Sequence, residues 1–485
     1  MTITHLSELE LEFGGGNRHA DIRFGLMEYG PLDQESQLAP KVIHTGIVGT
    51  NQTIAGVVAW LEHCRDEIAA KPSRQPNLFP RFPGFKQAFG ATLVLDPLLH
   101  SVLAHDDLTA LMKSTTGNRL VRGAVDMFVN AIQDLENKKV DLIICAPPFD
   151  LVDAMDQRIH LDEEREINPE NVRYEDTEEH VANFHDLLKA RTNLLKKPIQ
   201  IVLPSTYDER QRRTQRRHTD RARKLQDEAT RAWNFHTALY YKAGGAPWRI
   251  QRDSTELTTC YVGVSFYFDL KRDRLLTSTA QVFNERGDGI IVRGGVAKIS
   301  KEDRQAHLSS DDSCRLLVSA LLRYRQHHRT LPARVVVYKT STFNEEEVDG
   351  FLGAAQEHRV DVTELLSVRD STIKLFREGA YPPLRGTFLS VDPKVHVLYT
   401  RGSVPFYSTY PGMYVPRALE FSCHHTEQTP LFLAKEILAL TKMNWNNTQF
   451  DGAHPICVRA ARRVGSILRY IDEQKDIEAR YSFYM

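Results

Sequence analysis

The most constraining feature of this sequence of 485 residues is a change in its hydrophobic pattern about halfway along the chain. In the first half, short apolar runs typical of strands, such as 42–50 and 139–148, alternate with segments such as 52–70, where apolar residues recur at helical spacing. In the second half, the runs at 258–270 and 278–295 are longer and alternate polar with apolar residues. Strands that alternate with helices predict an α/β fold with a mostly parallel sheet, and the second half adds a β-hairpin.

The second half continues with a helix at 313–328, a strand at 333–339 and two further helices at 429–442 and 454–471. An antiparallel meander, a crossover helix and a parallel strand have the layout of an RNase H-like sheet, although several α/β folds share such a string of elements. Gly and Pro residues at 244–247 mark a boundary between two domains.

The charge of the chain is balanced only on average, with 62 Lys and Arg against 63 Asp and Glu. Residues 151–182 hold eleven Asp or Glu and three Lys or Arg, whereas residues 208–224 hold eight Lys or Arg and three Asp or Glu. This balance excludes a uniformly basic nucleic-acid coat protein but leaves room for a local basic face. Six cysteines without a CxxC pair, the lack of a signal peptide and of an apolar run of about 20 residues predict a soluble cytoplasmic protein.

Several stretches are specific enough to indicate a family. They lie at 240–250 (YYKAGGAPWRI), 260–266 (CYVGVSF), 335–347 (VVVYKTSTFNEEE) and 433–446 (LAKEILALTKMNWN), with YSFYM at 481–485. They resemble the PIWI domain of Argonaute proteins, and the first half resembles the MID domain that precedes it. The resemblance implies an α/β protein with a Rossmann-like MID domain at 46–250, an RNase H-like PIWI domain at 251–485, and an extended N-terminal segment at 1–45 that packs on this body.

The candidate guide pocket begins with His185 and Lys189, which lie four residues apart and therefore on one face of a predicted helix. Gln200 falls on the next predicted strand and Lys242 at the end of the following helix. In the family, such residues converge on the 5′-phosphate of the guide: ammonium groups neutralise it, the amide donates a hydrogen bond and the imidazole stacks on the first base. In prokaryotic relatives the last carboxylate, here that of Met485, helps to hold a divalent ion such as Mg²⁺. The alternatives are a solvated helix face for the first pair and a buried hydrophobic terminus for Met485.

An RNase H-like nuclease needs three or four carboxylates, or carboxylates and a His, that hold two divalent ions about 4 Å apart. In the resemblance, the first two of these positions fall on Ser265 and Thr340, and the last, in a C-terminal helix, falls on Lys435. Two hydroxyl groups and an ammonium group cannot assemble a pair of Mg²⁺ ions, so we expect no slicing activity. The alternative is a guided endonuclease with an unorthodox metal set that includes Asp269 or Glu345.

The resemblance is to short prokaryotic Argonautes, which consist of MID and PIWI domains and work with a partner protein that carries an APAZ region. It implies a subunit that is no enzyme itself, binds a short 5′-phosphorylated guide RNA and recognises complementary single-stranded DNA of plasmids or phages. Target recognition would activate the APAZ partner, with a sirtuin-like NADase favoured over a TIR NADase, in a heterodimer that forms higher oligomers on activation. The implied outcome is NAD depletion and abortive-infection immunity against the invader.

Two groups of arginines are candidate contacts to a nucleic-acid backbone. They are Arg212, Arg213, Arg216 and Arg217 in the basic segment and Arg459 and Arg463 in the last helix. Eight cations within seventeen residues exceed what the solvation of a helix needs. The alternatives are an exposed helix or a surface that docks on an acidic partner for the first group, and a solvated helix face for the second.

Overall fold

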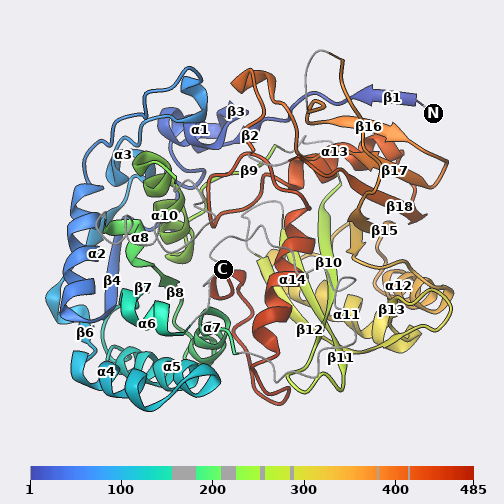
Figure 1. Ribbon diagram of the computed structural model, residues 1–485. Helices are drawn as coiled ribbons and strands as arrows, with labels where there is room; N and C mark the ends of the chain where they lie inside the picture. The colour runs from blue at the N-terminus through green and yellow to red at the C-terminus, as the bar shows by residue number, and fades with distance from the viewer. Residues whose placement is uncertain are drawn as a thin grey trace.

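The computed structural model describes residues 2–155, 182–208, 226–251, 257–283, 289–378, 382–412 and 415–485. Most of the acidic segment, the basic segment from Glu209 onward with Arg212, Arg213, Arg216 and Arg217, and the tip of the predicted hairpin lie outside these residues. Within them, strands form a five-stranded, a ten-stranded and a three-stranded sheet. The two larger sheets stand side by side, with helices between and around them (Figure 1).

The five-stranded sheet belongs to the first half of the chain and is parallel throughout, which confirms the predicted parallel α/β layer. Its path is β5 (Thr92–Val94), β4 (Val42–Gly49), β7 (Leu142–Ala146) and β8 (Ile199–Ile201), and β6 (His100–Val102) also pairs with β4. The domain boundary predicted between residues 45 and 46 falls inside β4, so the unit begins by Val42. β8 lies at one edge of the sheet, so the outward-pointing polar groups of its backbone need partners from outside the sheet.

Helices cover both faces of this sheet, as the apolar runs of its strands require. On one face, α5 (Gly117–Gln133) and α7 (Phe184–Leu194) pack on alternate residues of β7 and β8. On the other face lie α2 (Asn51–His63) and α10 (Glu228–Lys242). The shorter helices are α3 (Phe85–Phe89), α4 (His105–Ser114), α6 (Phe149–Ala154) and α8 (Pro204–Tyr207). Helix α10 ends just before Gly244, whose φ of +94° fits the predicted glycine termination.

The ten-stranded sheet carries most of the second half. In order across the sheet, its strands are β1 (Thr2–His5), β16 (Thr387–Ser390), β17 (Val395–Leu398), β18 (Leu419–His425), β15 (Val362–Asp370), β14 (Arg334–Lys339), β10 (Thr259–Phe268), β11 (Leu275–Phe283), β12 (Gly289–Ile299) and β13 (Ala306–His307). The meander β10–β11–β12 is antiparallel, and β14 joins β10 in parallel after a crossover through α11 (Ser310–His328). The predicted order of elements is therefore confirmed, whereas β15, β16 and β18 were not predicted.

The two faces of this sheet are covered by different helices. Helix α11 and α12 (Glu345–Glu357) pack on the face that presents Val262 and Val264. Helix α14 (Ile456–Leu468) crosses the other face along β10 and β11, and α13 (Pro430–Leu440) precedes it (Figure 1). A Cβ atom at Gly263 would lie 2.2 Å from the backbone carbonyl carbon of Cys457, so only glycine permits this close crossing of α14.

The N-terminal segment packs on the body, as predicted, but it is not simply extended. Strand β1 pairs with β16 at the edge of the large sheet, and α1 (Ile22–Tyr29) is a helix capped by Asp21. The three-stranded sheet joins β2 (Leu11–Glu12) and β3 (Arg18–His19) to β9 (Arg249–Ile250). The 3₁₀ helices are η1 (Gly14–Gly16), η2 (Pro76–Leu78), η3 (Pro97–Leu99), η5 (Pro405–Tyr407) and η6 (Tyr481–Phe483).

A buried ionic cluster holds this segment in place. Lys442, which is fully buried, donates hydrogen bonds to Glu8 Oε1 at 3.1 Å and to the backbone oxygens of Leu9 and Ala20, and Arg385 forms an ion pair with Glu8 at 2.9 Å.

No helix among the described residues is long and apolar enough to span a membrane.

Candidate nucleic-acid interface

Helix α7 presents a polar face that is buried rather than solvated. Asn183 caps its first turn by accepting a hydrogen bond from the backbone N–H of Asp186 at 3.0 Å. His185, Lys189 and Asn193 follow at intervals of four residues and therefore share one face. Their exposed fractions are 8%, 1% and 1%, because this face is turned toward α14 and the C-terminal segment. The solvated-helix alternative for His185 and Lys189 is therefore wrong.

Lys242, the last residue of α10, connects three parts of the fold. Its Nζ donates hydrogen bonds to Ile199 O at 2.9 Å, to Gln200 Oε1 at 2.6 Å and to Met485 O at 3.1 Å. Ile199 and Gln200 belong to the edge strand β8, so the ammonium group satisfies an outward-pointing carbonyl of that edge. The structure thus brings Gln200, Lys242 and Met485 together, and the buried Met485 also fits the alternative of a buried hydrophobic terminus.

The C-terminal segment is fixed at this place by the same helix. Asn193 donates from Nδ2 to Glu478 O at 3.3 Å and accepts at Oδ1 from the Glu478 backbone N–H at 3.0 Å. The hydroxyl of the buried Tyr484 also donates to Glu478 O, at 3.0 Å. Figure 1 shows the end of the chain at the centre of the molecule, between the elements of the smaller sheet and α14.

Lys189 and Lys242 lie on helices that cover opposite faces of the smaller sheet, but the charges of both affect the pKa of one buried thiol, that of Cys145. Burial raises the pKa of Cys145 on β7 to about 12, and the charges of the two lysines oppose that rise. Lys189 also lowers the pKa of His185 by charge repulsion. Lys242 lies at the edge strand β8 beside the C-terminus, and Lys189 lies on the buried face of α7 that is turned toward α14, so both belong to the seam between the two halves that α7, β8 and α14 form.

Arg463 enters this group from α14. Its guanidinium contacts the imidazole of His185 and forms an ion pair with Asp186 Oδ1 at 2.8 Å, and His185 Nδ1 lies 3.1 Å from the same oxygen. Burial, together with the charges of Arg463 and Lys189, holds the pKa of His185 well below its usual value, so this imidazole is neutral at pH 7. The guanidinium beside Asp186 holds the pKa of that carboxyl below its usual range, so Asp186 is ionised.

The arrangement unites the predicted pocket residues and adds three that sequence reasoning missed in this role. Asn193 could have been found, because it continues the spacing of four residues on α7. The role of Asp186 and its pairing with Arg463 could not have been found from the sequence, because Arg463 lies 278 positions from His185. Arg459, one turn earlier on α14, is partly exposed and remains only a candidate backbone contact.

A second predicted group lies on the large sheet. Ser265 is buried on β10 opposite Ser278 of β11, whose hydroxyl donates to Ala461 O of α14 at 2.8 Å. Thr340 follows β14, and its backbone N–H donates to Val264 O at 3.2 Å. Ser265 and Thr340 are therefore neighbours in the carboxyl-terminal half of β10 and just after β14, and α14 lies against the strand pair at Ser278.

The predicted position of Lys435 beside Ser265 and Thr340 is wrong. Lys435 is exposed on α13, and its neighbour Glu436 contacts the hydroxyl of Tyr261 at 2.7 Å, near the amino end of β10. Ser265 lies four residues further along that strand, about 13 Å away. The helix that reaches Ser265 is α14, with Ala461 at the contact, so sequence spacing selected the wrong one of the two C-terminal helices.

The carboxylates of the alternative metal set lie outside this group. Asp269 follows the end of β10 and accepts hydrogen bonds from the backbone N–H groups of Asp273 and Arg274, which is the role of a turn residue. Glu345 is exposed in the first turn of α12. In the described ranges, no three or more His, Cys, Asp or Glu side chains are grouped so that they could hold a metal ion.

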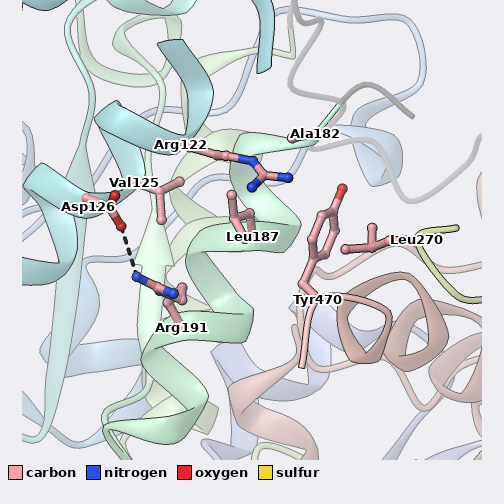
Figure 2. A pocket seen from close by; sticks show the side chains of 8 residues that line it. All are labelled: Arg122, Val125, Asp126, Ala182, Leu187, Arg191, Leu270 and Tyr470. Carbon is pink, nitrogen blue, oxygen red and sulfur yellow. Dashed lines mark hydrogen bonds and ion pairs between the residues drawn. The ribbon is translucent and has the colours of Figure 1, made fainter. Parts of the chain in front are cut away.

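A small pocket opens on the far side of α7, where the two halves of the chain meet. Figure 2 shows Arg122 of α5 pointing toward Tyr470 and Leu270 of the second half, while Asp126 of α5 and Arg191 of α7 point toward each other and are paired at 3.0 Å. The hydroxyl of Tyr470 accepts a hydrogen bond from the backbone N–H of Asn183 at 3.0 Å. This contact ties the start of α7 to the residues after α14.

These features define an α/β protein with two large sheets and a cationic, largely buried group at the seam between its halves. Solved structures share the fold. The chain is similar to Clostridium butyricum Argonaute bound to a guide DNA and a 19-mer target DNA (TM-score 0.64, 12% identity, 99% of this chain and 54% of that one). It is also similar to Drosophila Piwi (TM-score 0.62, 12% identity, 99% and 56%) and to Aa-Ago with externally bound siRNA (TM-score 0.61, 14% identity, 99% and 56%).

The chain thus has the fold of part of an Argonaute or Piwi protein and spans about half the length of these structures. No protein-family profile and no curated protein sequence matches it.

Proposed function

We propose that this chain is a guide-binding protein of the Argonaute type, with a Rossmann-like MID unit up to residue 250 and an RNase H-like PIWI unit after it. The proposal rests on the contacts of Lys242 with Gln200 and Met485, next to the buried face of α7 that carries His185 and Lys189 and meets Arg463 of α14. Such a group of cations and amides is suited to the 5′-phosphate of a short guide RNA.

The pocket residues would divide the work of binding the 5′ end. Lys189 and Lys242 supply positive charge against the phosphate, and Gln200 donates from its amide. The imidazole of His185 is neutral, so it contributes a stacking surface for the first base rather than charge. The C-terminal carboxylate of Met485 offers oxygen ligands of the kind that Mg²⁺ prefers, and together with phosphate oxygens it would hold that ion, which would neutralise the phosphate further.

We further propose that the chain holds complementary single-stranded DNA without cleaving it. Support comes from the residue types at the carboxyl ends of β10 and β14: Ser265 and Thr340 carry hydroxyl groups, and α14 approaches them with Ala461. Sequence resemblance to short prokaryotic Argonautes supports a partner with an APAZ region as the enzyme. Pairing of the target would activate that partner, a sirtuin-like or TIR NADase, and deplete NAD in the infected cell.

The pocket is tested by the nucleic acid that purifies with the protein. We expect wild-type protein to carry short 5′-phosphorylated RNA, and a His185→Ala, Lys189→Ala variant to lose most of it. The matched control is Arg191→Ala, a cation on the same helix that is exposed and paired with Asp126 outside the pocket. Equal RNA content in all three proteins would contradict the proposal.

The partner is tested by co-expression with an APAZ-containing neighbour. With guide RNA and complementary single-stranded DNA present, NAD⁺ should disappear while the DNA remains intact. Intact NAD⁺ with DNA cut opposite the guide would instead favour a guided endonuclease.

A further inference from the structure

A carboxylate lies inside the cationic group that the proposed function assigns to a phosphate. Asp186 follows His185 in the first turn of α7 and has an exposed fraction of 8%. Its Oδ1 lies 2.8 Å from Arg463 Nη2 and 3.1 Å from His185 Nδ1. A guanidinium nitrogen binds a carboxylate oxygen as it binds a phosphate oxygen, so Asp186 takes the place at Nη2 that one phosphate oxygen would take.

The position of this carboxylate matters because it is buried. Charges in water are screened over several ångströms, but buried charges act on one another at a much lower effective dielectric constant. Asp186 therefore offsets one of the three positive charges that Lys189, Lys242 and Arg463 bring to the site. It also repels any dianion that binds beside it.

We propose that Asp186 is a specificity-determining residue that limits the preference of this pocket for a 5′-phosphate over a 5′-hydroxyl guide. The inference rests on the proposed guide-binding function. Arg463 stays paired with Asp186 when a 5′-hydroxyl guide binds, so such a guide leaves the charge of Arg463 offset. A 5′-phosphate gains less binding free energy than three cations without a neighbouring carboxylate would give. The reason is that Asp186 retains Arg463 and repels the phosphate.

The wild-type protein gives the first test, by fluorescence anisotropy with one short RNA prepared with either a 5′-phosphate or a 5′-hydroxyl. We expect the Kd for the phosphorylated RNA to be lower by less than about tenfold, because one carboxylate offsets one guanidinium. A preference of about a hundredfold or more would overturn the inference, and this outcome needs no variant.

The second test removes the charge and keeps the shape. Asp186→Asn leaves an oxygen that accepts from Arg463, and we expect it to raise the preference for the 5′-phosphate by about tenfold relative to wild type. The matched control is Asp126→Asn, which removes the carboxylate of the exposed Asp126–Arg191 pair between α5 and α7 and should leave the preference unchanged. A preference that stays constant or falls in Asp186→Asn would overturn the inference, since a fall would mean that Asp186 only orients Arg463.

A third comparison separates charge from orientation. In an Arg463→Met background no guanidinium remains to be oriented, so adding Asp186→Asn should still tighten binding of the phosphorylated RNA. Weaker or equal binding by the double variant would contradict the inference. Failure of wild-type protein to bind either RNA would overturn the proposed function itself, whereas binding with an unaltered preference in Asp186→Asn overturns only the role of Asp186.

Discussion

The buried ion pair next to Thr340 gives a prediction that can be worked through in numbers. Lys339 and Glu347 both have fully buried side chains, and Lys339 Nζ lies 2.6 Å from the Glu347 carboxylate. The same carboxylate accepts from the Leu308 backbone N–H at 2.9 Å and lies 2.9 Å from His307 Nδ1. The pair therefore fixes the end of β14, where Thr340 meets β10.

Substitution of one partner alone should be more harmful than substitution of both. Glu347→Gln leaves the Lys339 ammonium group buried without its anion, and such a loss costs about 3–5 kcal/mol of unfolding free energy. Lys339→Met with Glu347→Gln removes both charges and should cost clearly less than the single change. Chemical unfolding followed by far-UV circular dichroism measures both, and equal destabilisation by the single and double variants would refute the reasoning.

The pH dependence gives an independent check. Burial lowers the pKa of Lys339 from 10.5 to about 8. Between these values the unfolded chain binds the proton and the folded chain does not, so the unfolding free energy rises with pH in this window. The cost of burying the charged Lys339 side chain is fully present below about pH 8. Deprotonation removes this cost by about pH 10.5 and so raises the unfolding free energy by about 3 kcal/mol.

The double variant is the reference for this measurement, since other groups titrate in both proteins. We expect wild type to gain about 3 kcal/mol of stability relative to Lys339→Met with Glu347→Gln between pH 8 and pH 10.5. Parallel curves for the two proteins would show that burial does not perturb this lysine.

Three further predictions concern the two candidate sites. Lys242→Met removes the donor of three hydrogen bonds, so the unfolding free energy should fall by about 3 kcal/mol, and the affinity for 5′-phosphorylated guide RNA should fall severalfold, within the less than about tenfold that the phosphate contributes; unchanged anisotropy titrations would contradict the second part. Asn193→Ala should speed hydrogen exchange in residues 478–485, because both bonds to the Glu478 backbone are lost; unaltered protection would show that other contacts hold this segment. Wild-type protein loaded with guide should leave complementary DNA intact with Mg²⁺ or Mn²⁺, whereas cleavage that disappears in Asp269→Ala or Glu345→Ala would establish the endonuclease alternative.

Local patterns predicted those parts of the molecule that depend on neighbours in the sequence. The spacing of His185 and Lys189 correctly placed them on one helix face, and the apolar runs located β4, β7 and β8. Alternation of polar and apolar residues located the meander of the large sheet.

Contacts between distant segments were beyond such reasoning. The pairing of Asp186 with Arg463 depends on how α14 crosses the seam, which no spacing encodes. Lys435 was assigned to the Ser265 group because spacing cannot tell which C-terminal helix covers the carboxyl end of β10. Short segments such as α1 are stabilised by tertiary contacts as well as by local signals, and a turn-rich composition hid that helix.

The central claim is that the 5′ end of a guide lies at the seam formed by α7, β8 and α14. The most direct measurement is photocrosslinking of a short 5′-phosphorylated RNA whose first nucleotide is 4-thiouridine, followed by mass spectrometry of the crosslinked peptide. The account predicts crosslinks within residues 184–194 or 456–468, beside His185 and Arg463, and their loss when the photoreactive base is moved to the 3′ end. Crosslinks confined to strands β16–β18, or equal labelling from both ends of the RNA, would contradict it.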